Sequence, residues 1–189
     1  AANKTSLWEY LNNSSEKKLP LPEIQIIGGG AHAKGSIPIQ DFMIIPNGAP
    51  DFNTALHWVF KIYKLAGEKL FSENKLYGVA DEGGYWPYFD DINSVLDFLV
   101  KVIEDAGFEL YKQVSLSLDI AANNFRFNEK YRISNKKDIL LSSNDLYCYL
   151  LELIKSYPII SLEDPFAEGD IEYFKKLKEN SPSYLQIVG

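Results

Sequence analysis

The chain has 189 residues, a formal net charge of −7 and 46% hydrophobic residues. This length and composition allow one substantial buried core and exclude a disordered chain. The acidic balance argues against a nucleic-acid partner, because a phosphate backbone is bound by a basic surface, and the sequence has no apolar run of the roughly 18 residues that would indicate a membrane span.

The first residues contain no apolar stretch of the signal-peptide type, and the single cysteine, Cys148, cannot form an internal disulfide. We therefore expect a cytoplasmic protein. Cys148 lies between two tyrosines in an apolar helical stretch. No histidine is close to it in sequence, so we expect a buried structural thiol and not a nucleophile.

The N-terminal part reads as a connecting segment followed by strands. Residues 1–22 hold a short apolar patch, a polar stretch and the extended run Leu19-Pro20-Leu21-Pro22. We therefore divide the chain into a linker segment, residues 1–22, and a folded domain, residues 23–189. The apolar residues 24–27 predict a short buried strand that three glycines end, and the apolar run 37–46 predicts a second strand.

Two helices are predicted next. In the first, apolar residues recur at helical spacing from Phe52 to Tyr63, and His57 beside them is expected to be packed and without function. In the second, residues 92–103 form a continuous apolar stripe, and Gly107 stands where a C-terminal cap would end the helix.

The remaining chain alternates strands and helices. Strands are predicted at 115–120, 159–163 and 185–188, a helix opens at the capping box Ser142-x-x-Asp145, and another helix spans 171–178. Such alternation indicates parallel strands joined by right-handed crossovers. A complete eight-stranded barrel takes about 250 residues. We therefore predict an α/β fold with about the first five strands of a barrel, and expect the rest to come from sequence beyond residue 189 or from another chain.

Two of these strands end in a carboxylate. Ser117 and Asp119 share one face of the first strand, as Ser161 and Glu163 do on the next. Barrel enzymes build their sites at the carboxyl ends of strands, and hard oxygen ligands there suit Mg²⁺. The alternative, that each acid only caps the following loop, stays open.

Two loops carry further candidates. Asp81-Glu82-Gly83-Gly84-Tyr85 is either a simple turn or a rigid loop that presents one carboxylate. The glycine-rich run 28–35 has backbone N–H groups that an anion can approach, although it lacks the layout of nucleotide-binding loops. We expect its histidine, His32, to be functional.

Five motifs occur in the order found in enolases, and the chain resembles that family over nearly its whole length. They are Gly29-Gly30-Ala31-His32-Ala33, Gln40-Asp41-Phe42-Met43, Asp81-Glu82-Gly83-Gly84-Tyr85, Leu118-Asp119-Ile120-Ala121-Ala122 and Ser161-Leu162-Glu163-Asp164-Pro165-Phe166. The resemblance implies an enolase-type TIM barrel, which begins β-β-α-α before its regular β-α units. It also implies a glycolytic lyase that dehydrates 2-phospho-D-glycerate to phosphoenolpyruvate with Mg²⁺, and a homodimer in the complete protein.

The same resemblance assigns roles to residues. Asp119 and Glu163 match two of three carboxylates that hold Mg²⁺. Glu82 and Asp41 match the paired acids that serve proton delivery and the departing hydroxyl, and Glu82, His32 and Gln40 match contacts to the phosphorylated substrate. The third carboxylate and the lysine base of the family would follow residue 189, so we expect the chain alone to be inactive.

Two positions depart from the family pattern. Asp41 stands where the family has glutamate, which shortens the side chain by one methylene, and Gly28 replaces an asparagine, which we expect to loosen the loop. These departures keep alternatives open. The chain is then a truncated or degenerate enolase-like scaffold or binding protein, or an enolase-superfamily enzyme with another substrate.

Overall fold

The computed structural model describes residues 4–12, 16–33, 37–133 and 139–189, and the features below refer to these residues. The α-helices are α1 (Leu7–Leu11), α2 (Phe52–Ser72), α3 (Ile92–Asp105), α4 (Ser143–Ser156) and α5 (Ile171–Asn180), with 3-10 turns η1 (Gly30–Ala33) and η2 (Ala122–Phe125). The strands are β1 (Ile24–Gly28), β2 (Asp41–Ile45), β3 (Leu76–Val79), β4 (Tyr85–Pro87), β5 (Ser115–Asp119), β6 (Arg126–Phe127), β7 (Lys130–Tyr131), β8 (Ile159–Glu163) and β9 (Gln186–Val188).

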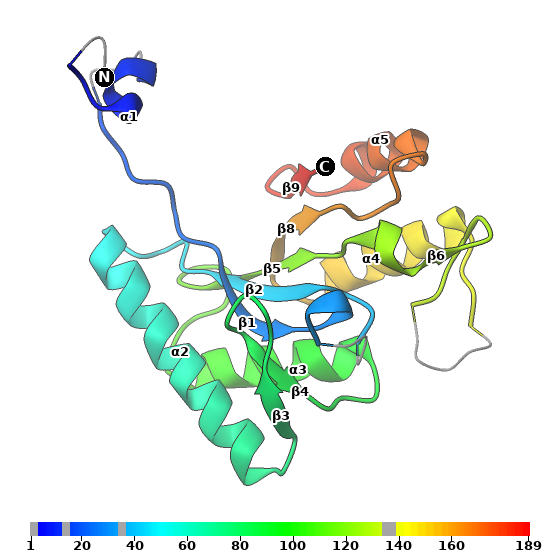
Figure 1. Cartoon of the computed structure of the whole chain (residues 1–189), viewed down its shortest axis with the longest axis horizontal. Coiled ribbons are helices and arrows are strands. Elements are labelled where there is room, and N and C mark those ends of the chain that lie inside the picture. The colour runs from blue at the N-terminus through cyan, green and yellow to red at the C-terminus, as the bar shows by residue number, and fades with distance from the viewer. Residues whose placement is uncertain (1–3, 13–15, 34–36, 134–138) are drawn as a thin grey trace.

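One mixed sheet organises the chain, as Figure 1 shows. Its seven strands lie in the order β3-β4-β1-β2-β5-β8-β9. β2 is antiparallel to both β1 and β5, whereas β5, β8 and β9 are parallel to one another. The helices α4 and α5 lie between these parallel strands in sequence. The predicted α/β fold is therefore confirmed as a mixed α/β fold with a partial sheet, and all five predicted strands are present.

The second strand is shorter than predicted. It begins at Asp41 rather than at residue 37, and residues 37–40 form bends. The backbone N–H of Gly29 donates to the Gln40 oxygen over 2.7 Å, and the N–H of Gly30 donates to the Ile37 oxygen over 2.6 Å. This segment therefore closes the glycine-rich loop instead of extending the strand.

The helix predicted from its apolar stripe is confirmed in α3. Its buried residues are Ile92, Val95, Leu96, Leu99, Val102 and Ile103. The Asp91 side chain caps the first turn by accepting a hydrogen bond from the Ser94 N–H, and Gly107 follows the last turn with φ of +85°. The Ser142–Asp145 capping box that opens α4 is also present.

Two burial predictions were wrong. Cys148 is exposed, because the buried face of α4 is formed by Leu146, Tyr147, Leu150, Leu153 and Ile154. His57 is also exposed on α2 and not packed. The buried face of α2 is narrower than the predicted stripe and leaves Phe60 64% exposed.

The N-terminal segment lies apart from the sheet. Figure 1 shows α1 at the far end of an extended stretch that leads into β1, and α1 buries none of its residues.

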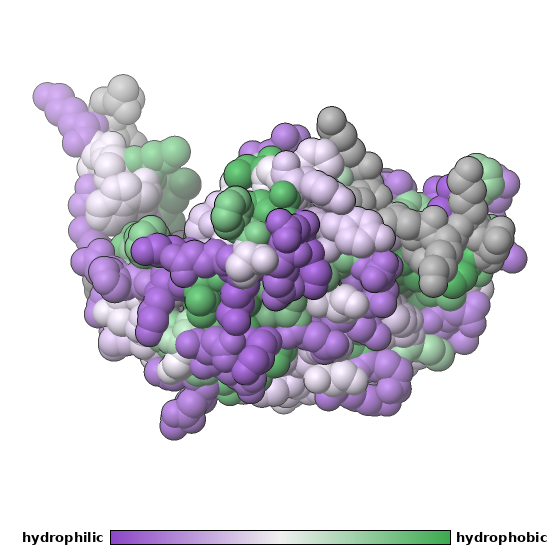
Figure 2. All heavy atoms as spheres, turned by 90° about the horizontal axis from the view of Figure 1, so that it is seen from below, coloured by the Kyte–Doolittle hydropathy of each residue, from purple (hydrophilic) through white to green (hydrophobic). Residues whose placement is uncertain are grey.

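On the face shown in Figure 2, apolar residues are interrupted by polar ones and form no continuous apolar surface. In the part of the chain that the structure describes, no helix is long and apolar enough to cross a membrane.

Candidate active site

The acidic residues predicted from the strand ends lie in one row across the sheet. Asp41 is the register partner of Asp119 on β5, and Asp119 is the partner of Glu163 on β8. Because β2 runs opposite to β5, its first residue arrives at the edge where β5 and β8 end. Register partners point to the same face of a sheet. The topology therefore places three carboxylates from three strands in one row, although among the described residues these three do not form a group whose ligand atoms all lie within 4.8 Å of one another.

Asp119 lies at the centre of this row. One of its oxygens accepts a hydrogen bond from the Ala121 N–H over 3.0 Å, and the other accepts from Gln40 Nε2, also over 3.0 Å. Burial, followed by repulsion from Glu163 and Asp41, raises the pKa of Asp119 to about 7. The site therefore disfavours the charge that a carboxylate normally carries at neutral pH.

Negative charge accumulates around Glu163 as well. Glu163 is exposed at the end of β8, yet the partial burial of its carboxyl is the largest cause that raises its pKa, and repulsion from Asp164 and Glu23 follows. Among the described residues, no ion pair joins Asp119, Glu163 or Asp164 to a lysine or arginine. Clustered oxygen donors without a protein counter-charge fit a hard divalent cation such as Mg²⁺.

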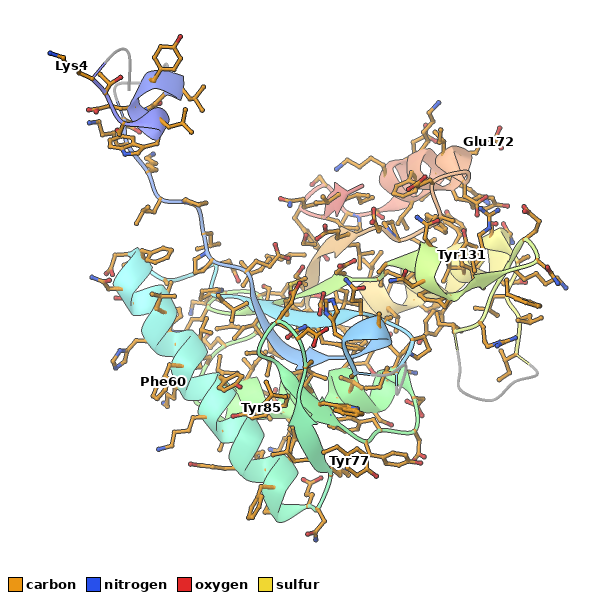
Figure 3. All side chains as sticks on the ribbon, in the orientation of Figure 1. Lys4, Phe60, Tyr77, Tyr85, Tyr131 and Glu172 are labelled. Carbon is orange, nitrogen blue, oxygen red and sulfur yellow. The ribbon has the colours of Figure 1, made fainter. Side chains whose placement is uncertain are left out.

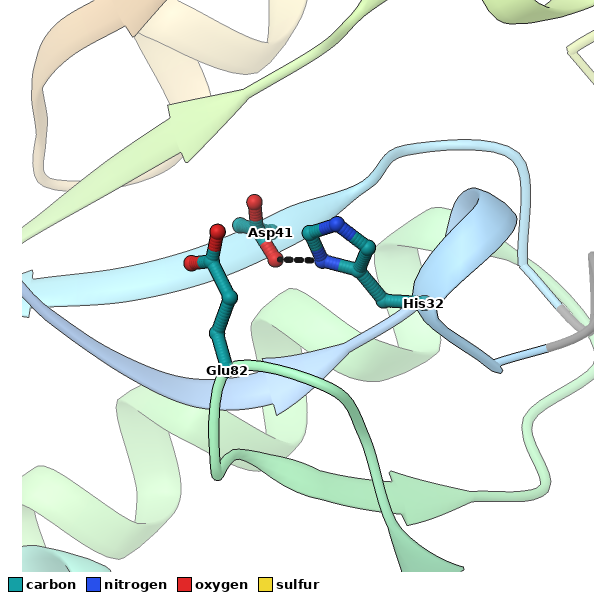
Figure 4. A group of neighbouring side chains, drawn as sticks. All are labelled: His32, Asp41 and Glu82. Carbon is teal, nitrogen blue, oxygen red and sulfur yellow. Dashed lines mark hydrogen bonds and ion pairs between the residues drawn. The ribbon is translucent and has the colours of Figure 1, made fainter.

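His32, Asp41 and Glu82 converge beside the row, as Figure 4 shows. One ligand atom from each of the three lies within 4.8 Å of the others. His32 Nδ1 is 3.1 Å from Asp41 Oδ1. Asp41 is 2% exposed, whereas Glu82 is exposed. Asp41 therefore lies in the interior behind Glu82, which solvent can reach.

The turn between β3 and β4 presents Glu82, and the structure shows what holds it. The Tyr63 hydroxyl on α2 donates to the Gly83 oxygen over 2.7 Å. Tyr85 stacks on the Tyr63 ring with centroids 4.3 Å apart, and Figure 3 shows Tyr85 between α2 and the β3–β4 hairpin. The motif is thus a turn and also a supported loop, so the two interpretations from sequence are compatible.

Gln40 makes contacts within the protein. Its Nε2 donates to Asp119, and its Oε1 accepts from Asn124 Nδ2 over 3.1 Å. The predicted substrate contact from Gln40 therefore stays a prediction, and the structure instead shows this amide orienting the central carboxylate.

The glycine-rich loop is closed by its own backbone. The N–H groups of Gly29 and Gly30 donate to the chain at residues 37–40, so they are occupied and do not point at an anion site. A Cβ at Gly28 would lie 2.3 Å from the Ala80 Cβ, so the glycine permits close packing at this point. The expectation that Gly28 loosens the loop stays a prediction. Lys34 and Gly35 of this run lie outside the described residues.

Sequence reasoning missed Gln25. Its Nε2 donates to Asp41 Oδ1, and its Oε1 accepts from the Gly84 N–H over 2.6 Å. The signal was one polar residue inside an apolar strand, which marks either a partnered amide or an exposed face. Gln25 is only 6% exposed, so it is a buried amide with partners and not part of an exposed face.

Comparison with known proteins identifies the family. Residues 16–189 match the family described as Enolase, C-terminal TIM barrel domain. The chain belongs to the enolase family. It is 40% identical over 187 residues to the enolase of Ehrlichia ruminantium (strain Welgevonden), and 39% identical over 187 residues to that of strain Gardel. It is 37% identical over 183 residues to the enolase of Ehrlichia canis (strain Jake).

These alignments differ in how much of each protein they cover. They include 97% of this chain but 43% of each of these enolases. The chain therefore spans less than half the length of the curated relatives that it matches. The match over residues 16–189 establishes family membership. An alignment that covers 43% of a relative does not establish the activity of a whole enolase.

Proposed function

We propose that this chain supplies part of the active site of an enolase, which removes water from 2-phospho-D-glycerate to form phosphoenolpyruvate. The row of register-matched acids Asp41, Asp119 and Glu163, with His32 and Glu82 beside it, carries this proposal. Family membership supports the reaction class and a phosphorylated small-molecule substrate.

The donor set supports a Mg²⁺ site at two of these acids. Asp119 and Glu163 are adjacent, acidic and without a basic partner among the described residues. They would hold the ion together with a ligand that the family resemblance places after residue 189. When bound, Mg²⁺ supplies positive charge that stabilises the doubly charged enediolate formed when a proton leaves the carbon beside a carboxylate.

The chain's other acids act on the leaving group. In the net reaction, C2 of the substrate loses a proton, the C3–O bond breaks, and the departing hydroxide takes up a proton to leave as water. Glu82 is accessible and supported on its turn, so it holds the proton for the hydroxide. Asp41 is buried beside it, and one ligand atom from each of the two acids lies within 4.8 Å of the other, so the pair faces the same leaving group.

The remaining assigned side chains bind and orient. His32 lies against Asp41 at the end of a backbone-closed loop, where it can face the substrate's phosphate. Gln40 orients Asp119. The family's carbon base is a lysine that the resemblance places after residue 189, so this chain alone is expected to bind substrate weakly and not turn it over.

The test is formation of phosphoenolpyruvate from 2-phosphoglycerate and Mg²⁺ by a full-length protein that carries this segment. Glu82→Gln should lower kcat by about 100-fold or more, the size expected for loss of a general acid. Glu179→Gln, an exposed change on α5, is the matched control and should leave kcat unchanged. A full-length protein without turnover would instead support the non-catalytic scaffold, and unchanged kcat in Glu82→Gln would remove the role of Glu82.

A further inference from the structure

Gln25 connects three separate parts of the site through one side-chain amide. It lies on β1, and its two hydrogen-bond partners are 16 and 59 residues away in sequence. The first is the carboxylate of Asp41 at the start of β2, and the second is the Gly84 N–H in the turn that carries Glu82. No other feature of the described structure joins Asp41 directly to that turn through a single side chain.

The chemistry of the two contacts requires an amide. Asp41 offers only acceptors when ionised, so it needs the NH₂ group, and the Gly84 N–H needs the carbonyl oxygen. A glutamate at position 25 would place a second carboxylate against Asp41. A hydrocarbon side chain would leave the buried Gly84 N–H without this acceptor, which costs its desolvation. It would also remove the amide donor from Asp41, which would keep only its contacts with His32 and Gln40.

The backbone closes tightly around this amide. A Cβ built at Gly84 would lie 2.5 Å from Gln25 Oε1, and one built at Gly28 would lie 3.2 Å from Gln25 Nε2. Gln25 is 6% exposed and Asp41 is 2% exposed. The amide therefore has no free space into which it can move.

This close fit makes the lengths of the two side chains interdependent. Glutamine has two methylenes and aspartate has one, and their polar ends are in direct contact. A glutamate at position 41 would drive its carboxylate into the Gln25 amide unless residue 25 became shorter by one methylene. The family resemblance showed only that the Asp41 side chain is one methylene shorter than the usual glutamate, whereas the structure pairs it with the longer side chain of Gln25.

We propose that Gln25 is a positioning residue for the Asp41–Glu82 acid pair, and that its length is matched to the aspartate at position 41. Through the Gly84 N–H, Gln25 holds the Glu82 turn at a fixed distance from Asp41. The catalytic part of this inference rests on the proposed function, whereas the matched lengths do not.

The first measurement is a double-mutant cycle on stability in this chain. The variants are Gln25→Asn, Asp41→Glu and the combination of both, compared by their urea unfolding midpoints. Each single change should lower the midpoint, because one leaves a gap and the other overfills the site. The combination should recover more than half of the summed loss. Gln186→Asn, the same change at an exposed position of β9, is the control and should not shift the midpoint.

The second measurement repeats the cycle for kcat and KM in a full-length protein that carries this segment, with 2-phosphoglycerate and Mg²⁺. Each single change should lower kcat by roughly 10- to 100-fold with KM within about threefold, since a misplacement of about 1 Å acts on the transition state. The kcat of the combination should be at least tenfold above the value expected if the two single losses were additive.

If the losses in unfolding midpoint are additive, the proposal that the two side-chain lengths are matched is overturned. If the midpoint losses are coupled but the effects on kcat are additive or absent, the pair of Gln25 and Asp41 has a structural role only, and the positioning role is overturned. A wild-type protein without activity would refute the proposed function, while the stability cycle would still decide the matched lengths.

Discussion

At the scale of single residues, the site concentrates negative charge that the fold alone does not neutralise. Asp119 accepts two hydrogen bonds, yet burial and two neighbouring carboxylates still raise its pKa to about 7. Natural sites often retain such destabilising groups because function requires them. The cost should therefore be visible as a dependence of stability on pH.

The sign of this dependence follows from proton uptake. A carboxyl with a raised pKa in the folded chain keeps a proton that the unfolded chain releases between about pH 4 and pH 7. The free energy of unfolding should therefore fall as the pH rises through this range, and stay low above pH 7. Asp119→Asn cannot lose a proton, so its decline between pH 5 and pH 7.5 should be smaller.

The measurement is urea unfolding of the wild type and Asp119→Asn at both pH values, in buffer containing a chelator. Glu163 contributes to the decline in both proteins, and because it repels Asp119 the difference between them reports Asp119 together with its coupling to Glu163. Equal declines in the two proteins would show that Asp119 does not titrate in this range.

At the scale of elements, the packing of β1 against the β3–β4 hairpin depends on a missing side chain. A Cβ at Gly28 would lie 2.3 Å from the Ala80 Cβ. Gly28→Ala should lower the free energy of unfolding by about 1–3 kcal/mol, the usual cost of overpacking. Gly78→Ala is the matched control, since its Cβ would meet Trp86 at an ordinary 3.6 Å.

Chemical denaturation of both variants tests this prediction. The control should change stability by no more than about 0.5 kcal/mol, as expected where the added methyl group fits. Equal losses at the two glycines would mean that the effect comes from backbone entropy and not from the contact with Ala80.

The elements differ in how well the sequence predicted them. The stripe of α3 and the capping box at Ser142 were predictable, because both are local patterns that tertiary structure did not override. The β3–β4 hairpin was missed, because its strands are short and contain Gly78 and Pro87, residues that strands disfavour. The exposure of Cys148 depended on which face of α4 met the sheet.

The site shows the same division. The carboxylates of Asp119 and Glu163 were found from alternation along each strand, because that pattern is local. The Gln25 network was not found, because it joins residues 16 and 59 positions apart, and no local pattern reports such a contact. The start of β2 was misplaced because bends and strands share the same extended apolar composition.

At the scale of the whole molecule, the N-terminal segment should contribute little to stability. α1 buries none of its residues, and Lys17 pairs with Glu9 within the same segment. Removal of residues 1–18 should therefore change the Tm by less than about 2 °C, since about 1 kcal/mol corresponds to about 2–4 °C for a chain of this size.

Thermal unfolding followed by circular dichroism compares the truncated and complete chains. The cut leaves Glu23, which accepts a hydrogen bond from the Ser117 hydroxyl, in place. A fall in Tm of ten degrees or more would show that the segment packs on the domain and that the division at residue 22 is wrong.

The row of acids also has a consequence for misfolding. Successive residues of a strand face opposite sides of the sheet, so a slip of one residue between β2 and β5 would exchange Asp119 for Leu118 in the row. The slipped chain would then bury a carboxylate in the apolar layer and expose a leucine among acids. The acidic residues of the row thus also disfavour the misaligned strand pairing during folding, independently of any substrate.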